Sequence, residues 1–223
     1  MKYITILLGA TGGFCWILAY VFIIYKGIKD KTYGMPLIPL VLNFGYEFTY
    51  SFFYPVNRMF NLPWLLLDLG IIYTYFKYGY PYFSKIYLIE KKQWYFISVF
   101  AFSMGFLIMF FAHQFFSQNF SKIPNEQVNV FLGFIAALFI PICLTLMFFQ
   151  RKDLAGQSFL IAFLMLVGTF AYVLQILSSP IFANCVSPFL ILINIITILV
   201  QFYYTKLLYT QIIKLGDNPW KRL

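Results

Sequence analysis

Charge is scarce in this sequence. Only 10% of its 223 residues are charged and seven are acidic, whereas 62% are hydrophobic and 23% are aromatic. A water-soluble domain of this length needs more polar surface than that to cover itself. The composition therefore excludes an ordinary soluble domain and indicates a membrane protein.

The residues that usually bind metals are also few. The chain has one histidine and three scattered cysteines, without a CxxC spacing, too few for a usual zinc site. It contains no GxGxxG, GxxxxGK[ST] or GxSxG motif, and no aspartate-rich motif of the kind that binds a diphosphate through magnesium. We therefore expect no metal and no cofactor.

Long hydrophobic runs are what the sequence has in abundance. Each is long enough to cross about 30 Å of hydrocarbon as a helix, and too continuously apolar for the alternating strands of a barrel. The first run lacks a signal-peptide cleavage pattern, so we expect it to be retained. No linker, low-complexity tract or internal repeat divides the chain. The sequence thus predicts an all-α membrane protein, a seven-transmembrane helix bundle forming one domain over 1–223, with spans at about 4–25, 35–54, 62–79, 94–116, 128–149, 157–178 and 187–209.

The placement of basic residues predicts the orientation. The formal charge is +9, yet all but Lys2, Arg58 and Lys122 of the 16 basic residues fall on one side of the predicted membrane. By the positive-inside rule the N-terminus lies outside and the C-terminus lies in the cytoplasm. We interpret the basicity as an orientation signal with some attraction to anionic lipid, not as a nucleic-acid surface. The expected location is the bacterial inner membrane, or the endoplasmic reticulum if the source is eukaryotic.

Two acidic residues lie inside predicted spans. A charge in hydrocarbon costs on the order of 3 kcal/mol even on the lenient insertion scale, so such residues usually face the bundle interior and mark function. Glu47 and Asp68 lie at similar depth on consecutive, antiparallel predicted helices. We expect both carboxyl groups to share one interior cavity that opens to lipid or to an interface. The other acids fall in loops or the tail, where we expect water to solvate them: Asp30, Glu90, Glu126, Asp153 and Asp217.

Each of these two acids has a companion one helical turn earlier. Asn43 precedes Glu47 and offers an amide to orient the carboxyl group, while Trp64 precedes Asp68 and offers an aromatic wall. Tyr46 and Tyr50 add aromatic surroundings that disfavour an ionised carboxylate, so Glu47 can hold its proton and act as a buried general acid. The alternative is structural: Glu47 as a polar pin between helices, and Asp68 hydrogen-bonded to a neighbouring helix.

Aromatic residues are the commonest large side chains, with 29 Phe and 18 Tyr. Most are expected to face lipid, pack or form interfacial belts. Aromatic faces around a dry pocket can also stabilise a cation, each by about 1–2 kcal/mol. The single histidine, His113, is expected as a wet interfacial residue, with a proton relay as the alternative.

Four motifs in register resemble one enzyme family. The stretch "KGIKDKTYGMPLIPLVLNFGYEFTYSFFYP", followed by "PWLLLDLGIIYTYFKYG", is similar to the small seven-helix membrane terpene cyclases of fungal meroterpenoid and indole-diterpene pathways and their bacterial relatives. "GQSFLIAFLMLVGT" at 156–169 resembles their GQS and GT elements, and "LLYTQIIKLGDNPWKRL" their tail. The resemblance covers nearly the whole chain in the same order.

This resemblance implies a metal-independent cyclisation of a prenyl or epoxy-prenyl chain, an isomerase or lyase reaction that protonation starts. Glu47 matches the catalytic glutamate of the family, and Asn43, Trp64 and Asp68 match its neighbouring positions. Asp68 then shapes the site or serves as a second acid. The implied partners are an apolar prenylated substrate and the lipid bilayer.

The last predicted helix departs from the family pattern. The family has an acid there, whereas the alignment on "YTKLLY" puts Gln201 at that position and Tyr204 at the following tyrosine. Glutamine forms hydrogen bonds but does not exchange a proton as a carboxyl group does. Two other functions therefore stay open beside the cyclase: a non-catalytic isoprenoid- or lipid-binding protein, and a small proton-coupled carrier that uses Glu47 and Asp68.

Overall fold

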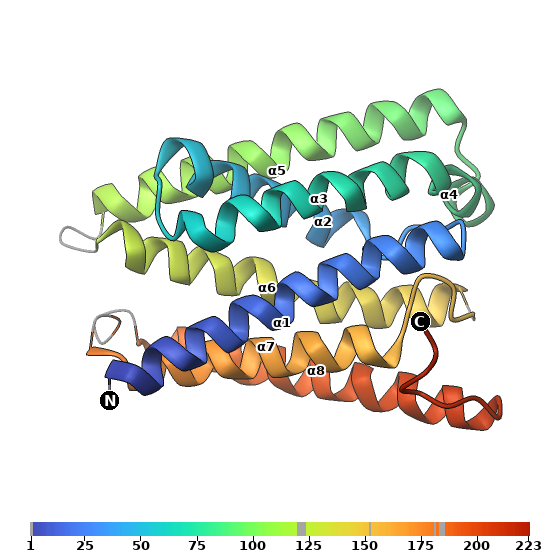
Figure 1. Ribbon diagram of the computed structural model, residues 1–223. Coiled ribbons are helices and arrows are strands. Elements are labelled where there is room, and N and C mark those ends of the chain that lie inside the picture. Colours follow the sequence, from blue (N-terminus) through green and yellow to red (C-terminus); the bar gives the residue numbers. More distant parts are fainter. Residues whose placement is uncertain (1, 120–123, 152, 181, 183–185) are drawn as a thin grey trace.

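Helices form all the regular structure in the described part of the chain, residues 2–119, 124–151, 153–180, 182 and 186–223 of the computed structural model (Figure 1). Lys152 and Cys185 lie outside the described residues. The elements are α1 (Lys2–Lys29), α2 (Leu37–Phe48), the π-helical turn η1 (Thr49–Phe53), α3 (Arg58–Tyr78), α4 (Tyr80–Tyr87), α5 (Lys91–Asn119), α6 (Asn125–Arg151), α7 (Phe159–Ser178) and α8 (Pro188–Lys214).

Six of the described helices are long and apolar enough to cross a membrane: α1, α3, α5, α6, α7 and α8. The predicted count of seven is not confirmed. The segment predicted to span over 35–54 forms only the 12-residue α2 before the chain turns π-helical at Thr49. Twelve residues of α-helix cover about 18 Å, well short of the roughly 30 Å of hydrocarbon. The connection between the predicted spans 62–79 and 94–116 contains the short helix α4.

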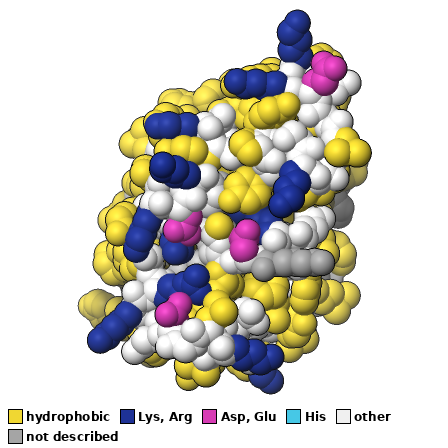
Figure 2. Space-filling view, turned by 90° about the vertical axis from the view of Figure 1, so that its right-hand side faces the viewer, with side chains coloured by type: hydrophobic (Ala, Val, Ile, Leu, Met, Phe, Trp, Pro, Cys, Tyr) yellow, Lys and Arg dark blue, Asp and Glu magenta, His cyan; other side chains and the backbone are white. Residues whose placement is uncertain are grey.

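The long helices run side by side as one bundle (Figure 1). α1 packs along α7, α7 contacts α8, and α2 is inserted among α3, α5 and α6. The N-terminus lies at one end of the bundle, which we call the N-terminal end. The other end carries the α1–α2 connection, α4, the α6–α7 connection and the C-terminus. We call it the basic end, because lysines and arginines gather over it (Figure 2).

The outward faces of the bundle are apolar. Phe96 on α5 is 74% exposed, and Leu199 on α8 is 63% exposed. Exposing an apolar surface this extensive is unfavourable in water but not in contact with lipid tails. Together with the six apolar helices, this surface makes the chain a multi-pass integral membrane protein.

The "KDKTYGMP" and "GQS" motifs meet at the basic end. Asp30 accepts a hydrogen bond from the Gly156 amide at 2.9 Å and pairs with Lys26 at 3.0 Å. It is therefore a structural group rather than the freely solvated loop acid that we expected. The Arg151 guanidinium lies 3.9 Å from the centre of the Tyr33 ring and donates to the Tyr33 carbonyl. These contacts fasten the entry of α2 to the α6–α7 connection.

Two glycines place α2 deep in the bundle. A Cβ atom on Gly45 would lie 2.4 Å from the carbonyl oxygen of Gly105 on α5, and one on Gly105 would lie 2.4 Å from the carbonyl oxygen of Val41. Backbone therefore touches backbone, as small residues allow between membrane helices. This close crossing turns the face of α2 that carries Asn43 and Glu47 toward the interior, where both are buried.

Candidate active site

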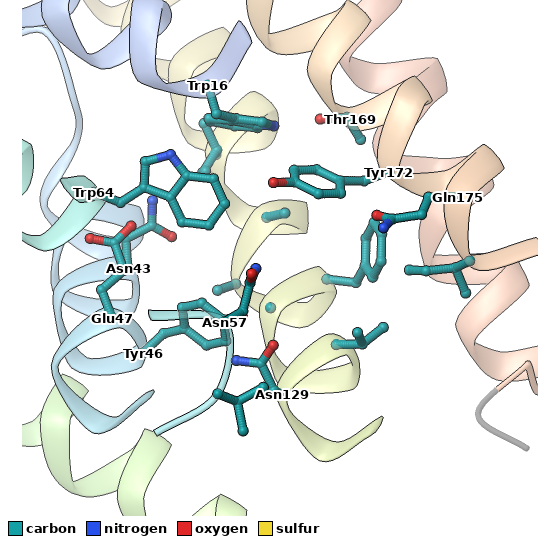
Figure 3. Close-up of a pocket in the computed structure, with 18 of the residues that line it drawn as sticks. Trp16, Asn43, Tyr46, Glu47, Asn57, Trp64, Asn129, Thr169, Tyr172 and Gln175 are labelled. Atoms are coloured by element: carbon teal, nitrogen blue, oxygen red, sulfur yellow. The ribbon is translucent and has the colours of Figure 1, made fainter. Parts of the chain in front are cut away.

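A cavity of about 360 Å³ lies between α1, α2, α3, α6 and α7 (Figure 3). This volume is at the lower end of the range for small-molecule sites, about 300–1,000 Å³. Aromatic rings form much of the lining: Trp16 and Tyr20 from α1, Tyr46 from α2, Trp64 from α3, Phe134 from α6 and Tyr172 from α7. Such a cavity suits an apolar ligand.

Glu47 reaches this cavity from the last turn of α2. Its side chain is 2% exposed, and Oε1 accepts a hydrogen bond from the Tyr20 hydroxyl at 3.4 Å. Asn43 donates to that same hydroxyl oxygen at 2.6 Å. Asn43 therefore acts on Glu47 through Tyr20 and not directly. Oε2 of Glu47 is buried and has no hydrogen-bond partner.

Asp68 lies behind Glu47. It is completely buried on α3 and interacts with the Glu47 carboxyl group, but it is not among the residues that line the cavity. Two ionised carboxylates have no donor between them, so a hydrogen bond between the groups requires a proton on one of them. The arrangement gives Glu47 a neighbour with which a proton can be shared.

Some of the predicted substrate-binding residues line the cavity and others lie outside it. Trp64 and Tyr46 line the cavity, and the indole nitrogen of Trp64 has no partner. Tyr50 is buried outside it and bonds His113 Nδ1 at 2.9 Å. Gln201 is 1% exposed on α8 and also lies outside it, with both amide atoms unpartnered.

Tyr204 and His113 have structural surroundings. The Tyr204 hydroxyl donates to Gln157 in the α6–α7 connection at 2.9 Å, away from the cavity. His113 is 1% exposed, and Tyr54 stacks on its ring at 3.7 Å. The expectation of a wet interfacial histidine is therefore wrong, because the chain after α2 folds over this side chain.

The sequence did not indicate the cavity walls that α1, α6 and α7 contribute. Tyr20 is one of 18 tyrosines, and nothing in its local sequence distinguishes it. On α7, Thr169 and Tyr172 line the cavity with unpartnered hydroxyl groups, and Tyr172 points across it toward the side of Trp64 (Figure 3). Thr169 and Tyr172 are three residues apart and therefore lie on one helical face, and this spacing is the sequence feature that relates them.

Glycines set the position of these walls. A Cβ atom on Gly12 of α1 would lie 2.9 Å from the Tyr172 ring, and one on Gly168 of α7 would lie 2.8 Å from the Trp16 ring. Tyr172 of α7 thus packs against Gly12 of α1, and Trp16 of α1 packs against Gly168 of α7. These two contacts let α1 and α7 approach closely while both rings border the cavity.

A metal site does not emerge from the geometry. Within the described residues, no group of three or more histidine, cysteine, aspartate or glutamate side chains lies close enough together to hold a metal ion. What the cavity does present among its aromatic faces is the buried carboxyl group of Glu47, with one unpartnered oxygen.

Comparison with known proteins gives the family. The sequence profile of the Pyr4-like transmembrane terpene cyclases matches residues 1–214. The Pyr4-family terpene cyclase mfmH of Annulohypoxylon moriforme is 27% identical over 70% of this chain and 63% of its own length. Terpene cyclase pyr4 of Aspergillus fumigatus is 34% identical over 44% of this chain and 43% of its own length. Terpene cyclase dpasB of Apiospora sacchari is 43% identical over 29% of this chain and 28% of its own length.

The chain thus spans less than two thirds of the length of these curated relatives, and no solved structure matches it. The profile match nevertheless runs over almost the entire sequence, through the segments that build the cavity. The chain therefore belongs to the Pyr4-like transmembrane terpene cyclase family.

Proposed function

We propose that this protein cyclises a prenyl or epoxy-prenyl chain by protonating it, with Glu47 as the general acid. The observation that carries the proposal is a buried carboxyl group with an unpartnered oxygen, Oε2, in an aromatic-lined cavity inside a membrane bundle. Burial away from water disfavours a charged carboxylate, so the neutral acid that the reaction needs is the favoured form.

The reaction conserves mass. The Glu47 proton goes to an epoxide oxygen, whose C–O bond breaks to leave a hydroxyl group and a carbocation, or to a terminal alkene carbon, whose π electrons form the new C–H bond. Neighbouring double bonds then attack the cation in turn, and a final proton loss forms an alkene. Trp16, Trp64 and Tyr172 present aromatic groups to the cavity, and each ring face can stabilise a cation by about 1–2 kcal/mol.

Other residues position the acid. Tyr20 and Asn43 hold one oxygen of Glu47, and Asp68 provides a second carboxyl group beside it. We assign Asp68 to sharing or returning the Glu47 proton, since it does not reach the cavity. Tyr50, Gln201 and Tyr204 do not line the cavity, so we assign them no contact with substrate.

The family and the cavity together favour an apolar prenylated substrate that enters from the lipid. We propose that the basic end lies in the cytoplasm, as the positive-inside rule predicts, and that the short α2 forms a seventh, partial crossing. We propose the bacterial inner membrane as the location, or the endoplasmic reticulum in a eukaryotic source.

The test uses membranes that contain the protein and epoxidised farnesyl- and geranylgeranyl-phenols as probes. We expect cyclic isomers of unchanged mass, and Glu47→Gln should slow their formation by about 10²–10⁴-fold, the usual contribution of a general acid. Glu90→Gln, an exposed carboxyl group at the basic end, is the matched control. Equal product from Glu47→Gln would show that the acid assignment is wrong.

A further inference from the structure

The cavity has a carboxyl group at each of two levels. Among its lining residues that the structure describes, Glu47 and Glu126 are the two acids. Asp68 is buried outside the lining, and α8 with Gln201 contributes no lining residue. Glu126 lies in the first turn of α6, where it is exposed. This glutamate, which the sequence placed in a solvated loop, thus borders the cavity on its open side.

The two carboxyl groups are separated along α6. The Tyr46 hydroxyl lies only 2.9 Å from where a Cβ atom on Gly133 would be, so the residue next to Glu47 reaches the level of Gly133. Glu126 precedes Gly133 by seven residues, or about 10 Å of helix. The lining of α6 continues beyond Gly133 to Ile140, roughly another 10 Å.

Polarity changes along the same axis. The exposed end of the lining includes Glu126 and the amide side chain of Asn57, whereas around Glu47 it consists of the rings of Tyr20, Tyr46 and Trp64 with the amide of Asn43. An amphipathic substrate therefore fits with its apolar chain inside and its polar head at the open side. In that orientation the far end of the prenyl chain meets Glu47, and the cation travels back toward Glu126.

We propose that Glu126 is the terminal base of the cyclisation, an inference that rests on the proposed function. After the last ring closes, a C–H bond next to the cationic carbon gives its electron pair to a new C=C bond, and its proton passes to a Glu126 carboxylate oxygen. Water at the open side of the cavity takes that proton away. One proton enters through Glu47 and one leaves through Glu126, so the product is an isomer of the substrate.

The proposal predicts a change in the product. Glu126→Gln is assayed with the epoxidised farnesyl-phenol probe. The ratio of unchanged-mass alkene to water adduct, which is heavier by one water, should fall by about tenfold or more, since water then competes for an unquenched cation. Glu126→Asp should restore part of the alkene, and Glu90→Gln should leave the ratio unchanged.

Each other outcome has a meaning. An unchanged product ratio in Glu126→Gln overturns the proposal, and so does loss of substrate consumption, because the group would then act in binding or initiation. Failure of the proposed function itself is recognised separately, by wild-type membranes that do not convert the probes or by full activity of Glu47→Gln.

Discussion

A single hydroxyl group connects the two residues that the sequence paired. Asn43 and Glu47 are one turn apart on α2, yet the Tyr20 hydroxyl from α1 stands between them, accepting from Asn43 and donating to Glu47. This contact holds one oxygen of the acid, while the other, Oε2, has no hydrogen-bond partner. Such support from a neighbouring helix fixes the geometry of a catalytic group.

Removing that hydroxyl should misalign the acid without closing the cavity. Tyr20→Phe is expected to lower kcat by about tenfold with KM nearly unchanged, since the contact acts on the acid and not on the bound substrate. Steady-state kinetics on the epoxidised probes measure the split. Tyr25→Phe, half-exposed on the same helix, serves as the control. A rise in KM alone would indicate instead that Tyr20 contacts substrate.

At the scale of elements, α2 owes its position to backbone contact and not to length. It is too short to cross the membrane by itself, and its glycine crossing with α5 holds it between three longer helices. The π-helical turn begins two residues after Glu47, and the chain then folds over His113. The short helix thus presents its acid inside the bundle, in its last turn.

Filling that crossing should destabilise the bundle. Gly105→Ala puts a methyl group against the Val41 carbonyl, so α2 and α5 must move apart, at about 1–3 kcal/mol for an overpacked site. Gly9→Ala is the matched control, because its new methyl group meets only the amide end of the Gln175 side chain, which can rotate away. Thermal unfolding in detergent should show a lower Tm for Gly105→Ala alone. Equal Tm values for both variants would contradict a rigid crossing.

For the whole molecule, the charge distribution and the arrangement of ends agree. Lysines end α1, α3 and α8 at the basic end, and the C-terminal tail folds back there, with Trp220 packed 4.8 Å from the Phe159 ring centre. The N-terminal end carries the open side of the cavity, at Glu126 and Asn57. If the basic end is cytoplasmic, the cavity opens toward the opposite face of the membrane.

Labelling can test this orientation in intact cells. In a variant whose native cysteines are replaced, Gln118→Cys at the N-terminal end should react with a membrane-impermeant maleimide. Lys214→Cys at the basic end should react only after the cells are lysed, because the positive-inside rule places it in the cytoplasm. The reverse pattern of labelling would show that the protein has the opposite orientation in the membrane. Both side chains are exposed, so accessibility within the protein does not limit the reaction.

The sequence by itself determined that the chain is a helical membrane protein, and it singled out Glu47. Hydrophobic length and the cost of a charge in lipid are local properties, so they can be read along the chain. The same applies to Trp64, whose helical spacing from Asp68 was visible. The family motifs could likewise be recognised without coordinates.

Only the tertiary structure decided which side chains share the cavity. Asp68 is withdrawn behind Glu47, Gln201 lies outside, and Glu126 borders the open side, although all three are polar residues on long helices. α2 is too short for a span because its α-helix ends where the π-helical turn η1 begins, and Tyr50 of that turn bonds to His113. Helix rotation and depth come from contacts between distant glycines and aromatic residues. Local hydrophobicity does not reveal those contacts, because each contact joins residues of two helices that are far apart in the sequence.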